Sequence, residues 1–506
     1  MKSSSDAHVP DILDTISNLS NDEVFTPPDV ANEVLDLLPP EVWKDSTLRF
    51  LDPASKTGIF LREAARRLMV GLEDEFPDED VRRSHIFKNM LFGFPITELT
   101  GLVSRRSVYY SKDASGEHSI IRFDDEQGNI PFVRMEHTYS VDGKCTICGS
   151  PQEQLERGES RENYAYRFIH DKEVVNLKFD VIVGNPPYQL ESAGHGAQAT
   201  PIYQLFVEQA FRLKPRYVAL ITPSRWFAGG MGLDAFRKRM LDSKNFKYLV
   251  DFPDGSEVFP GTQIKGGVSY FLWDRDYEGP CEVKTVQGGA EGTKSHRYLG
   301  EHGDIFIRFN DALPILEKVQ KKQLGTIEEW ISATNPFGLA TNFKGYTDTS
   351  EKLDDIPLYT SSGVKYLSRR ELPQGAEHLG KWKVFTPKAG PGNDGYPHKI
   401  LGDPIVAPED AACTMTYLVG GKFEDQRSAE NYAALLQTRF IRFLVALRKN
   451  TQHVTRNSFK FVPQMDLNRR WTDEELYSFF EITEDEQIFI ASIVREISSD
   501  EADTQS

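Results

Sequence analysis

A short run of apolar and β-branched residues from Phe179 to Gly184, followed at once by Asn185-Pro186-Pro187-Tyr188, most constrains how this chain can fold. A run of this length that is bounded by glycine and proline is typical of a strand buried in a parallel sheet. The carboxyl end of such a strand is where open α/β sheets bind their ligands. We therefore expect these four residues to lie in a functional crevice.

The segment from 28 to about 276 repeats this pattern, with short apolar stretches that alternate with amphipathic ones. The alternation predicts an α/β fold, a Rossmann-like sheet with helices on both faces. The expected strands are 48–51, 90–96, 119–123, the strand ending at Asn185, 217–222, 247–252 and 267–273. The expected helices are 29–38, 59–72, 98–109, 201–213 and 233–241.

Changes in composition divide the chain into four parts. Residues 1–24 are a polar N-terminal extension, and residues 25–277 form the sheet domain, in which 124–178 are a polar insertion. Residues 278–300 become Gly-rich and polar, which predicts a linker. Residues 301–506 are expected to form a second, mixed α/β domain with an acidic, helical end at 471–497.

The tetrapeptide predicts recognition of a planar amino group. The side-chain amide of Asn185 and the carbonyl of Pro186 can both accept hydrogen bonds from an exocyclic amino nitrogen. Pro186 and Pro187 fix φ at about −65° and hold these acceptors still. Tyr188 offers a flat face on which a nucleobase can stack.

The formal net charge of −17 by itself argues against a nucleic-acid partner, because phosphate contacts need a positive surface. Basic residues nevertheless gather in the C-terminal third. They form either solvated faces or a groove that follows double-stranded DNA, and the base recognition suspected at residues 185–188 favours the groove. The candidate DNA-binding residues are Lys365, Arg369, Arg370, Lys388, Arg448, Lys449 and Arg456.

The chain has the features of a cytoplasmic protein. No apolar run approaches the ~20 residues that span a bilayer, and the N-terminal stretch is polar, so we expect no membrane partner. Four cysteines in 506 residues do not make a disulfide framework, which favours a reducing compartment.

A second motif, the loop from Leu51 to Phe60, joins a strand to a helix as a nucleotide-type ligand loop does. It reads Asp-Pro-Ala, then Thr-Gly-Ile-Phe, with Phe25-Thr26-Pro27 upstream and Asn-Pro-Pro-Tyr downstream. In these motifs and their order, residues 24–275 resemble the gamma class of S-adenosylmethionine-dependent DNA amino-methyltransferases. More narrowly, they are similar to the restriction–modification adenine methylases of that class.

The resemblance implies a class I methyltransferase sheet that binds S-adenosylmethionine and methylates N6 of a flipped-out adenine in a specific DNA sequence. The second domain is then a target-recognition domain. The implied catalytic residues are Asn185, Pro186, Pro187 and Tyr188, and the residues stacking on the target base are Tyr188 and Phe259. The implied cofactor-binding residues are Phe25, Thr26, Pro27, Asp52, Pro53, Ala54, Gly58, Phe60 and Glu98.

Two positions depart from the family pattern. Lys56 replaces a glycine of the cofactor loop, so the turn cannot freely adopt positive φ there. The acid that follows the second strand is missing, and Glu98 is the substitute. Phe259 also fits a core phenylalanine, and Trp226 is a weaker stacking candidate.

Alternative functions stay open from the sequence. The same tetrapeptide serves methylases of RNA bases and of glutamine side chains, and the two departures also suit an inert DNA-binding specificity subunit. Pro253-Asp254 with Glu282-Val283-Lys284 matches a loose nuclease pattern, which we weigh as a chance match. A separate nuclease or helicase partner is a further possibility.

Cys145-Thr146-Ile147-Cys148, in the polar insertion, is half of a zinc site, because tetrahedral zinc takes four ligands. His137 and His170 flank the pair and can complete a Cys2His2 set. The alternative is a turn with two free thiols. Zinc is therefore a candidate structural cofactor, whereas methyl transfer needs no catalytic metal.

Overall fold

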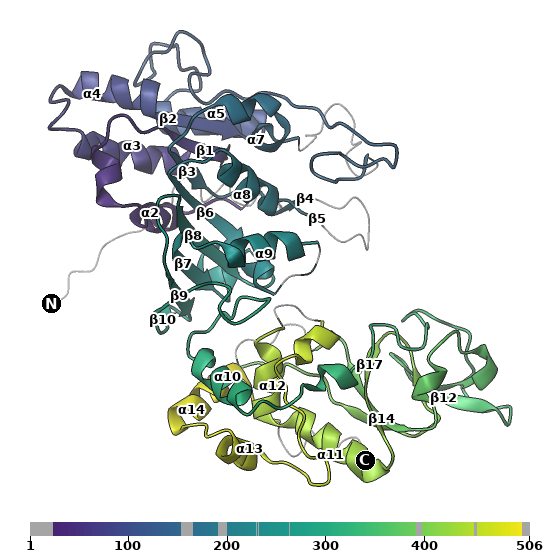
Figure 1. The fold of residues 1–506 in the computed structure, drawn as a ribbon. Helices are drawn as coiled ribbons and strands as arrows, with labels where there is room; N and C mark the ends of the chain where they lie inside the picture. Colours follow the sequence, from purple (N-terminus) through teal and green to yellow (C-terminus); the bar gives the residue numbers. More distant parts are fainter. Residues whose placement is uncertain are drawn as a thin grey trace, which may run out of the picture. The chain divides into compact units, whose positions relative to one another are not determined.

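The computed structural model describes residues 24–152, 165–190, 200–228, 230, 232–262, 264–390, 397–449 and 453–497. The chain divides into two compact units, Met1–Phe306 and Ile307–Ser506 (Figure 1). Most of the predicted N-terminal extension (1–24) and part of the predicted insertion (153–164) lie outside the described residues.

A nine-stranded sheet forms the first unit, in the order β10-β9-β7-β8-β6-β3-β1-β2, with β11 paired to β9. Strands β2, β1, β3 and β6 are parallel, and β8 runs antiparallel to its neighbours β6 and β7. The predicted α/β fold class is confirmed. The strands are β1 (Phe50–Ser55), β2 (Leu91–Pro95), β3 (Val181–Gly184), β6 (Tyr217–Pro223), β7 (Phe246–Phe252), β8 (Val268–Asp274), β9 (Cys281–Gln287), β10 (Ala290–Glu291) and β11 (Ser295–Arg297).

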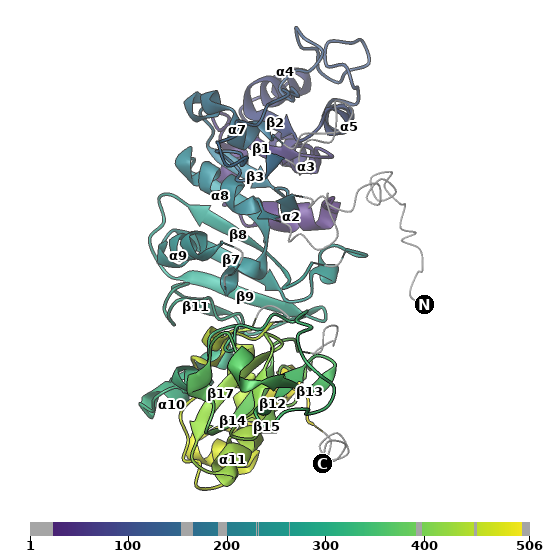
Figure 2. The same ribbon diagram turned by 90° about the vertical axis from the view of Figure 1, so that its right-hand side faces the viewer.

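Helices cover both faces of this sheet, as Figure 2 shows. Successive strand residues point to opposite faces: Phe50 and Val181 belong to one buried core, and Leu51 and Ile182 to the other. The first core is closed by α2 (Pro28–Asp36), η1 (Pro40–Lys44), α3 (Ile59–Gly71), η2 (Ile86–Met90) and α5 (Glu98–Tyr109). α4 (Glu79–His85) packs on α3 and η2. The second is closed by α7 (Arg167–His170), η3 (Lys172–Asn176), α8 (Tyr203–Arg212), η4 (Ser224–Phe227) and α9 (Asp234–Asp242).

The strand expected at 119–123 does not form. The backbone of Ile120 donates to Tyr109 and that of Phe123 donates to Ala114, so the segment folds over α5 instead of extending the sheet. At the edge strand β2, Gly93 donates to the carbonyl of Asn129. Two apolar residues at 120–121 were too short a signal to distinguish a strand from a loop in which they are half-buried.

The linker expected at 278–300 is also wrong, because these residues form β9, β10 and β11. Cys281, Val283 and Thr285 are buried at alternate positions, which is the period of a strand. Gly288 and Gly289 adopt positive φ in the turn between β9 and β10. The glycines that suggested a linker therefore belong to a tight hairpin.

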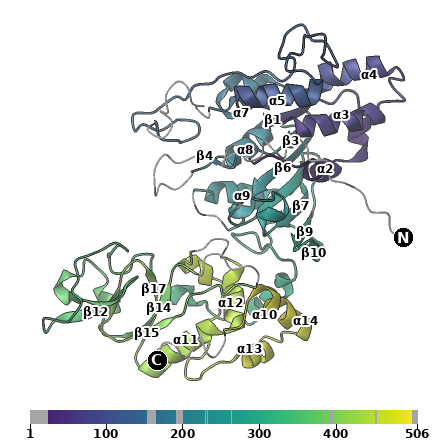
Figure 3. The ribbon, with the colours of Figure 1, turned by 180° about the vertical axis from the view of Figure 1, so that it is seen from behind.

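The second unit contains two three-stranded sheets, in the orders β13-β12-β16 and β15-β14-β17. Figure 3 shows α10, α12, α13 and α14 at one end and β12 at the other. Its strands are β12 (Asp355–Thr360), β13 (Gly363–Ser368), β14 (Trp382–Pro387), β15 (Ile405–Ala407), β16 (Ala412–Cys413) and β17 (Tyr417–Phe423). Its helices are α10 (Ala312–Lys321), η6 (Ile327–Trp330), η7 (Arg369–Glu371), η8 (Ala376–His378), α11 (Gln426–Gln437), α12 (Arg439–Ala446), η9 (Arg456–Phe459), α13 (Asp473–Phe479) and α14 (Glu484–Ile493).

None of the helices in the described part of the chain combines the length and the apolar character that a membrane crossing requires.

Candidate active site

The carboxyl ends of β1 and β3 lie where the strand order reverses, since β1 pairs with β2 on one side and with β3 on the other. Open α/β sheets bind ligands in the crevice outside such a switch point. Gly184 ends β3, and a Cβ added there would lie 2.8 Å from Asp52 Oδ1 in β1. The fold therefore brings the two sequence motifs together, and only glycine fits between them.

Asn185 follows β3 and is 3% exposed. Its Nδ2 donates to the Val24 carbonyl at 3.3 Å and to Thr26 Oγ1 at 3.2 Å. A carbonyl only accepts, so the nitrogen must face Val24 and the oxygen must face away. This buried Oδ1 has no hydrogen-bond partner among the described residues. An unpaired buried acceptor is costly, and a ligand amino group would remove that cost.

Tyr188 lies beside Asn185 and Phe259. Burial raises the pKa of the Tyr188 hydroxyl well above its usual value, and the Asn185 side chain opposes the shift only in part. The Tyr188 and Phe259 ring centroids are 6.4 Å apart with an interplanar angle of 66°. Pro186 and Pro187, which connect Asn185 to Tyr188, are also buried. The aromatic pair is edge-to-face, so one ring must turn before a base can lie between two parallel faces.

The segment Val24 to Pro27 is fastened to both strand ends. The Val24 carbonyl accepts a hydrogen bond from Lys56 Nζ at 2.9 Å as well as the one from Asn185. Phe25 is half-buried, Thr26 is buried, and Pro27 caps the start of α2. Sequence reasoning treated Lys56 as a departure from the pattern and missed this role, because the acceptor is a main-chain atom.

Asp52 is a buried carboxyl group in β1, and it is 2% exposed. Burial raises its pKa from the ordinary 3.8 to about 7, against the opposing effects of the Ala54 amide, of Lys56 and of Ser55. The Ala54 N–H donates to Asp52 Oδ1 at 3.1 Å. A cation placed against this carboxyl would compensate the buried charge.

The turn between β1 and α3 places its positive φ at Gly58 (+72°) and not at Lys56, which is absent from the described non-glycine residues with positive φ. A Cβ on Gly58 would meet Val108 Cγ2 at 2.9 Å. Lys56 therefore costs the turn no backbone strain. The first backbone N–H groups of α3 follow Gly58, and such groups suit an anion.

The other predicted cofactor residues lie in different environments. Pro53 and Ala54 are buried in β1, and Phe60 is a core side chain that is 2% exposed. Glu98 is exposed at the start of α5, after the carboxyl end of β2, and thus at the same edge as Asp52. Trp226 is fully buried in the second core among aromatic side chains.

Three of the predicted DNA-binding residues lie at the β13 end of the second unit, and each has an acidic partner. Lys365 pairs with Asp348 at 2.6 Å, Arg369 with Asp410 at 3.2 Å, and Arg370 with Asp354 at 3.5 Å. The side chains of Arg369 and Arg370 stay more than half exposed.

The remaining four come from two other segments. Lys388 and Lys449 are both half-buried. Lys449 lies next to the segment that follows Lys388, because a Cβ on Gly390 would be 3.0 Å from Lys449 Nζ. Arg456 is exposed and donates to the Glu328 carbonyl at 3.0 Å. Arg448 is 7% exposed, with its guanidinium over the Phe461 ring, so it packs inside the unit and does not offer its charge to a phosphate.

His137, Cys145, Cys148 and His170 form the one group of metal-type side chains that the described residues assemble. Their ligand atoms all lie within 4.8 Å of one another, and burial lowers the pKa of His170 to about 4. The acidic residues of the nuclease pattern form no such metal-binding group among the described residues. Asp254 caps η5 (Gly255–Glu257), whereas Glu282 lies in β9 and pairs with Lys294 and His296.

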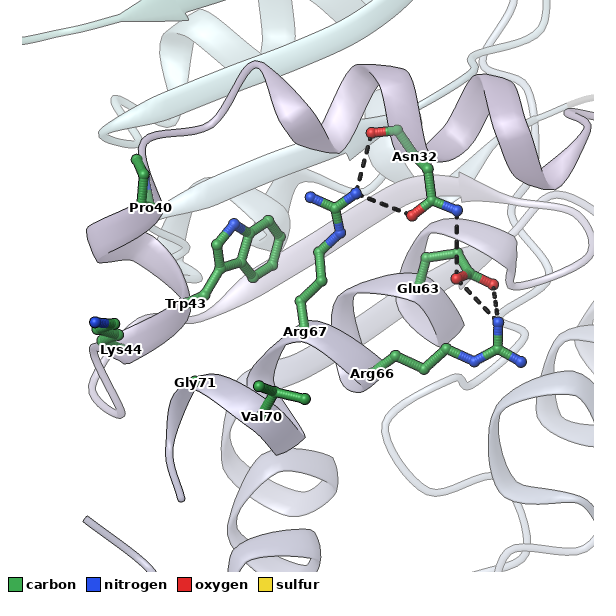
Figure 4. Close-up of a pocket in the computed structure, with 9 residues that line it drawn as sticks. All are labelled: Asn32, Pro40, Trp43, Lys44, Glu63, Arg66, Arg67, Val70 and Gly71. Carbon is green, nitrogen blue, oxygen red and sulfur yellow. Dashed lines mark hydrogen bonds and ion pairs between the residues drawn. The ribbon is translucent and has the colours of Figure 1, made fainter. Parts of the chain in front are cut away.

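A cavity of about 470 Å³ lies between α2, η1 and α3, away from both motifs (Figure 4). Arg67 crosses it, stacked 5.2 Å from the Trp43 ring centroid and bonded to Asn32 Oδ1 at 3.0 Å. None of the predicted site residues lines it. Its lining residues are Asn32, Pro40, Trp43, Lys44, Glu63, Arg66, Arg67, Val70 and Gly71.

Residues 89–259, which include β3, the tetrapeptide and Phe259, match the Eco57I restriction-modification methylase family. An uncharacterized adenine-specific methylase of Mycoplasma pneumoniae is 38% identical to this chain over 307 residues. That alignment covers 54% of this chain and 72% of the relative.

Several solved structures are also similar. A nuclease-deletion mutant of the Type ISP restriction-modification enzyme LlaGI, in complex with a DNA substrate mimic, has a TM-score of 0.48 at 12% identity, covering 94% of this chain and 47% of that one. The DrdV–DNA complex has a TM-score of 0.44 at 14% identity, covering 93% and 57%. The M protein of the Type I enzyme EcoKI has a TM-score of 0.36 at 13% identity, covering 54% and 50%. This chain thus spans about half the length of these solved chains.

Proposed function

Since this chain belongs to the family of adenine-specific restriction-modification methylases, we propose that it transfers a methyl group from S-adenosylmethionine to N6 of adenine in a specific DNA sequence. The observation that carries the proposal is the buried, unpaired Oδ1 of Asn185 at the carboxyl end of β3. It is an acceptor that awaits an N–H donor, and the adenine amino group is such a donor.

Asn185 acts on the acceptor nitrogen. The lone pair of adenine N6 is delocalised into the ring, which makes the nitrogen a poor nucleophile. Hydrogen bonds from N6 to Asn185 Oδ1 and to the Pro186 carbonyl favour a pyramidal nitrogen and localise that lone pair. Val24 and Thr26 hold the amide so that its oxygen faces the base.

Tyr188 provides a stacking surface for the base outside the double helix. An adenine within a duplex cannot reach a crevice at a strand end, so it must flip out at a cost of a few kcal/mol. Stacking on an aromatic ring contributes about 1 to 3 kcal/mol and offsets much of that cost. The neighbouring Phe259 ring, 6.4 Å away, can supply the second face after a rotation.

Asp52 and the turn to α3 fit the charges of S-adenosylmethionine. A buried carboxyl with a pKa of about 7 gains from a cation, which the cofactor's ammonium group offers. The N–H groups at the start of α3 suit its carboxylate, and Glu98 is placed to accept from the ribose hydroxyls. When bound, the cofactor supplies an electrophilic methyl group on a sulfonium sulfur.

The second unit is proposed to recognise the DNA target. Exposed Arg369, Arg370 and Arg456 support this role. The ion pairs of Arg369 and Arg370 with acidic residues can exchange for phosphate contacts. We further propose that the chain acts within a restriction–modification system, beside a separate nuclease or translocating subunit.

Labelled cofactor and unmodified genomic DNA test this function. We expect labelled N6-methyladenine at one sequence motif, mapped by long-read sequencing, and a loss of about 100-fold or more with Asn185→Ala. Asn431→Ala is the matched control, since Asn431 is a buried amide of the second unit that donates to the Leu467 carbonyl. Methylated cytosine, or unchanged labelling by Asn185→Ala, would refute the mechanism. Label that enters RNA or protein instead of DNA would identify another acceptor.

A further inference from the structure

We propose that His137, Cys145, Cys148 and His170 bind one structural zinc ion that fastens the insertion before β3 to the core of the first unit. None of these four residues is among those proposed for methyl transfer. Cys145 Sγ lies 3.8 Å from His170 Nε2, and Cys148 Sγ lies 3.6 Å from His137 Nδ1. All four ligand atoms are within 4.8 Å of one another.

The two sulfur–nitrogen separations fit tetrahedral zinc. Zinc binds thiolate sulfur at about 2.3 Å and imidazole nitrogen at about 2.0 Å, which places neighbouring ligand atoms roughly 3.3 to 3.8 Å apart. The two sulfur–nitrogen distances lie in or at the edge of that range. The His137 and His170 rings are nearly perpendicular, at 89° with centroids 4.9 Å apart, so their nitrogens approach one point from different directions.

The backbone around the cysteine pair forms a tight knuckle. Tyr139 bridges to Cys145 and Lys144 to Pro151, and the Ile147 N–H lies 3.5 Å from Cys145 Sγ. The Gly149 N–H donates to the Cys145 carbonyl at 2.9 Å, with a φ of +71° at Gly149. This turn directs both sulfur atoms to the same side, and an N–H that faces a sulfur stabilises a thiolate.

His170 is oriented by a main-chain atom. Its Nδ1 lies 3.1 Å from the Tyr166 carbonyl, which only accepts, so Nδ1 carries the proton and Nε2 presents a lone pair toward Cys145. Zinc-binding histidines usually have such a partner on the second nitrogen.

The site is closed, as structural zinc sites are. Cys145, Cys148 and His170 are buried, and both cysteines belong to the second hydrophobic core. His170 ends α7, which packs on α8, and β3 begins at Val181. A metal there ties the loop that carries Cys145 and Cys148 to the helix that leads into the catalytic strand.

The metal content of the purified full chain tests the site. Expressed in zinc-supplemented medium and dialysed without chelator, the wild type should hold about one equivalent of zinc by mass spectrometry. Cys148→Ala should lose it, whereas the control Cys281→Ala should keep it, since Cys281 is a buried free cysteine of the same unit outside the cluster.

Cobalt substitution of the wild type gives a readout that needs no variant to fold. We expect intense visible absorption of a tetrahedral ion and a thiolate charge-transfer band. Zinc-free wild type without that cobalt spectrum, or metal content that Cys148→Ala does not change, would overturn the proposal. The measurement uses neither DNA nor S-adenosylmethionine, so its failure would leave the proposed methylation untouched.

Discussion

Asp52→Asn should stabilise the ligand-free protein at alkaline pH while it abolishes cofactor binding. Asp52 is buried, and burial raises its pKa from 3.8 to about 7. Between these two pH values the native carboxyl keeps a proton that the unfolded chain has released. The native state therefore loses stability as pH rises through this window, and above about pH 7 the full cost of the buried charge is present.

The size of the effect follows from the two pKa values. At about 1.4 kcal/mol per pKa unit, a rise from 3.8 to about 7 corresponds to about 4 kcal/mol. Asparagine has the same shape, carries no charge and can still accept the hydrogen bond from the Ala54 amide. The variant should thus exceed the wild type by up to about 4 kcal/mol at pH 8, and by almost nothing at pH 4.

Hydrogen exchange of peptides that cover β1, measured across a urea series, is the suitable assay, because a chain with two units need not unfold in one transition. Calorimetric titration with S-adenosylmethionine tests the loss of cofactor binding, with binding expected for the wild type and none for Asp52→Asn. A stability difference between variant and wild type that is the same at both pH values would refute the reasoning.

Three further substitutions probe the same edge. Lys56→Met removes the hydrogen bond to the Val24 carbonyl and should raise the KM for the cofactor about tenfold with little change in kcat. Lys56→Arg should bring the KM part of the way back to the wild-type value. An unchanged KM in Lys56→Met contradicts this role. Gly184→Ala places a Cβ 2.8 Å from Asp52 Oδ1 and should lower the free energy of unfolding by about 1 to 3 kcal/mol in urea, and wild-type stability would contradict the close approach. Tyr188→Ala should reduce DNA methylation by about 5- to 150-fold, while Tyr188→Phe keeps most activity; an equal loss in both would assign the effect to the hydroxyl.

Local signals in the sequence predicted many element boundaries of the first unit. The helix at 98–109 was expected with the bounds it has, and in the structure a capping box of Thr97 and Thr100 begins it. The strand at 119–123 and the linker at 278–300 were wrong. Whether a short apolar pair joins a sheet, and whether a pair of glycines forms a hairpin or a linker, depends on the neighbouring segments that pack against them.

The residues of the candidate site also fall into those that the sequence predicted and those that it could not. Asn185, Tyr188 and Phe259 could be named from motifs, and the fold brings them together. The interaction of Lys56 with Val24 could not, since any residue has the same main-chain carbonyl. The burial of Arg448 could not be predicted from the number of basic residues either, because the sequence does not show which guanidinium packs on an aromatic ring.

The Val24 carbonyl receives one hydrogen bond from each half of the sheet edge, from Lys56 and from Asn185. A single peptide unit is thus shared by the two proposed binding regions, for the cofactor and for the base, and an occupant that tightens it on one side preorganises the other. Thermodynamic linkage requires this influence to be mutual and of equal size in both directions. Under the proposed function, S-adenosylmethionine and the target base should therefore raise each other's affinity through this carbonyl, in addition to the direct contact that methyl transfer requires.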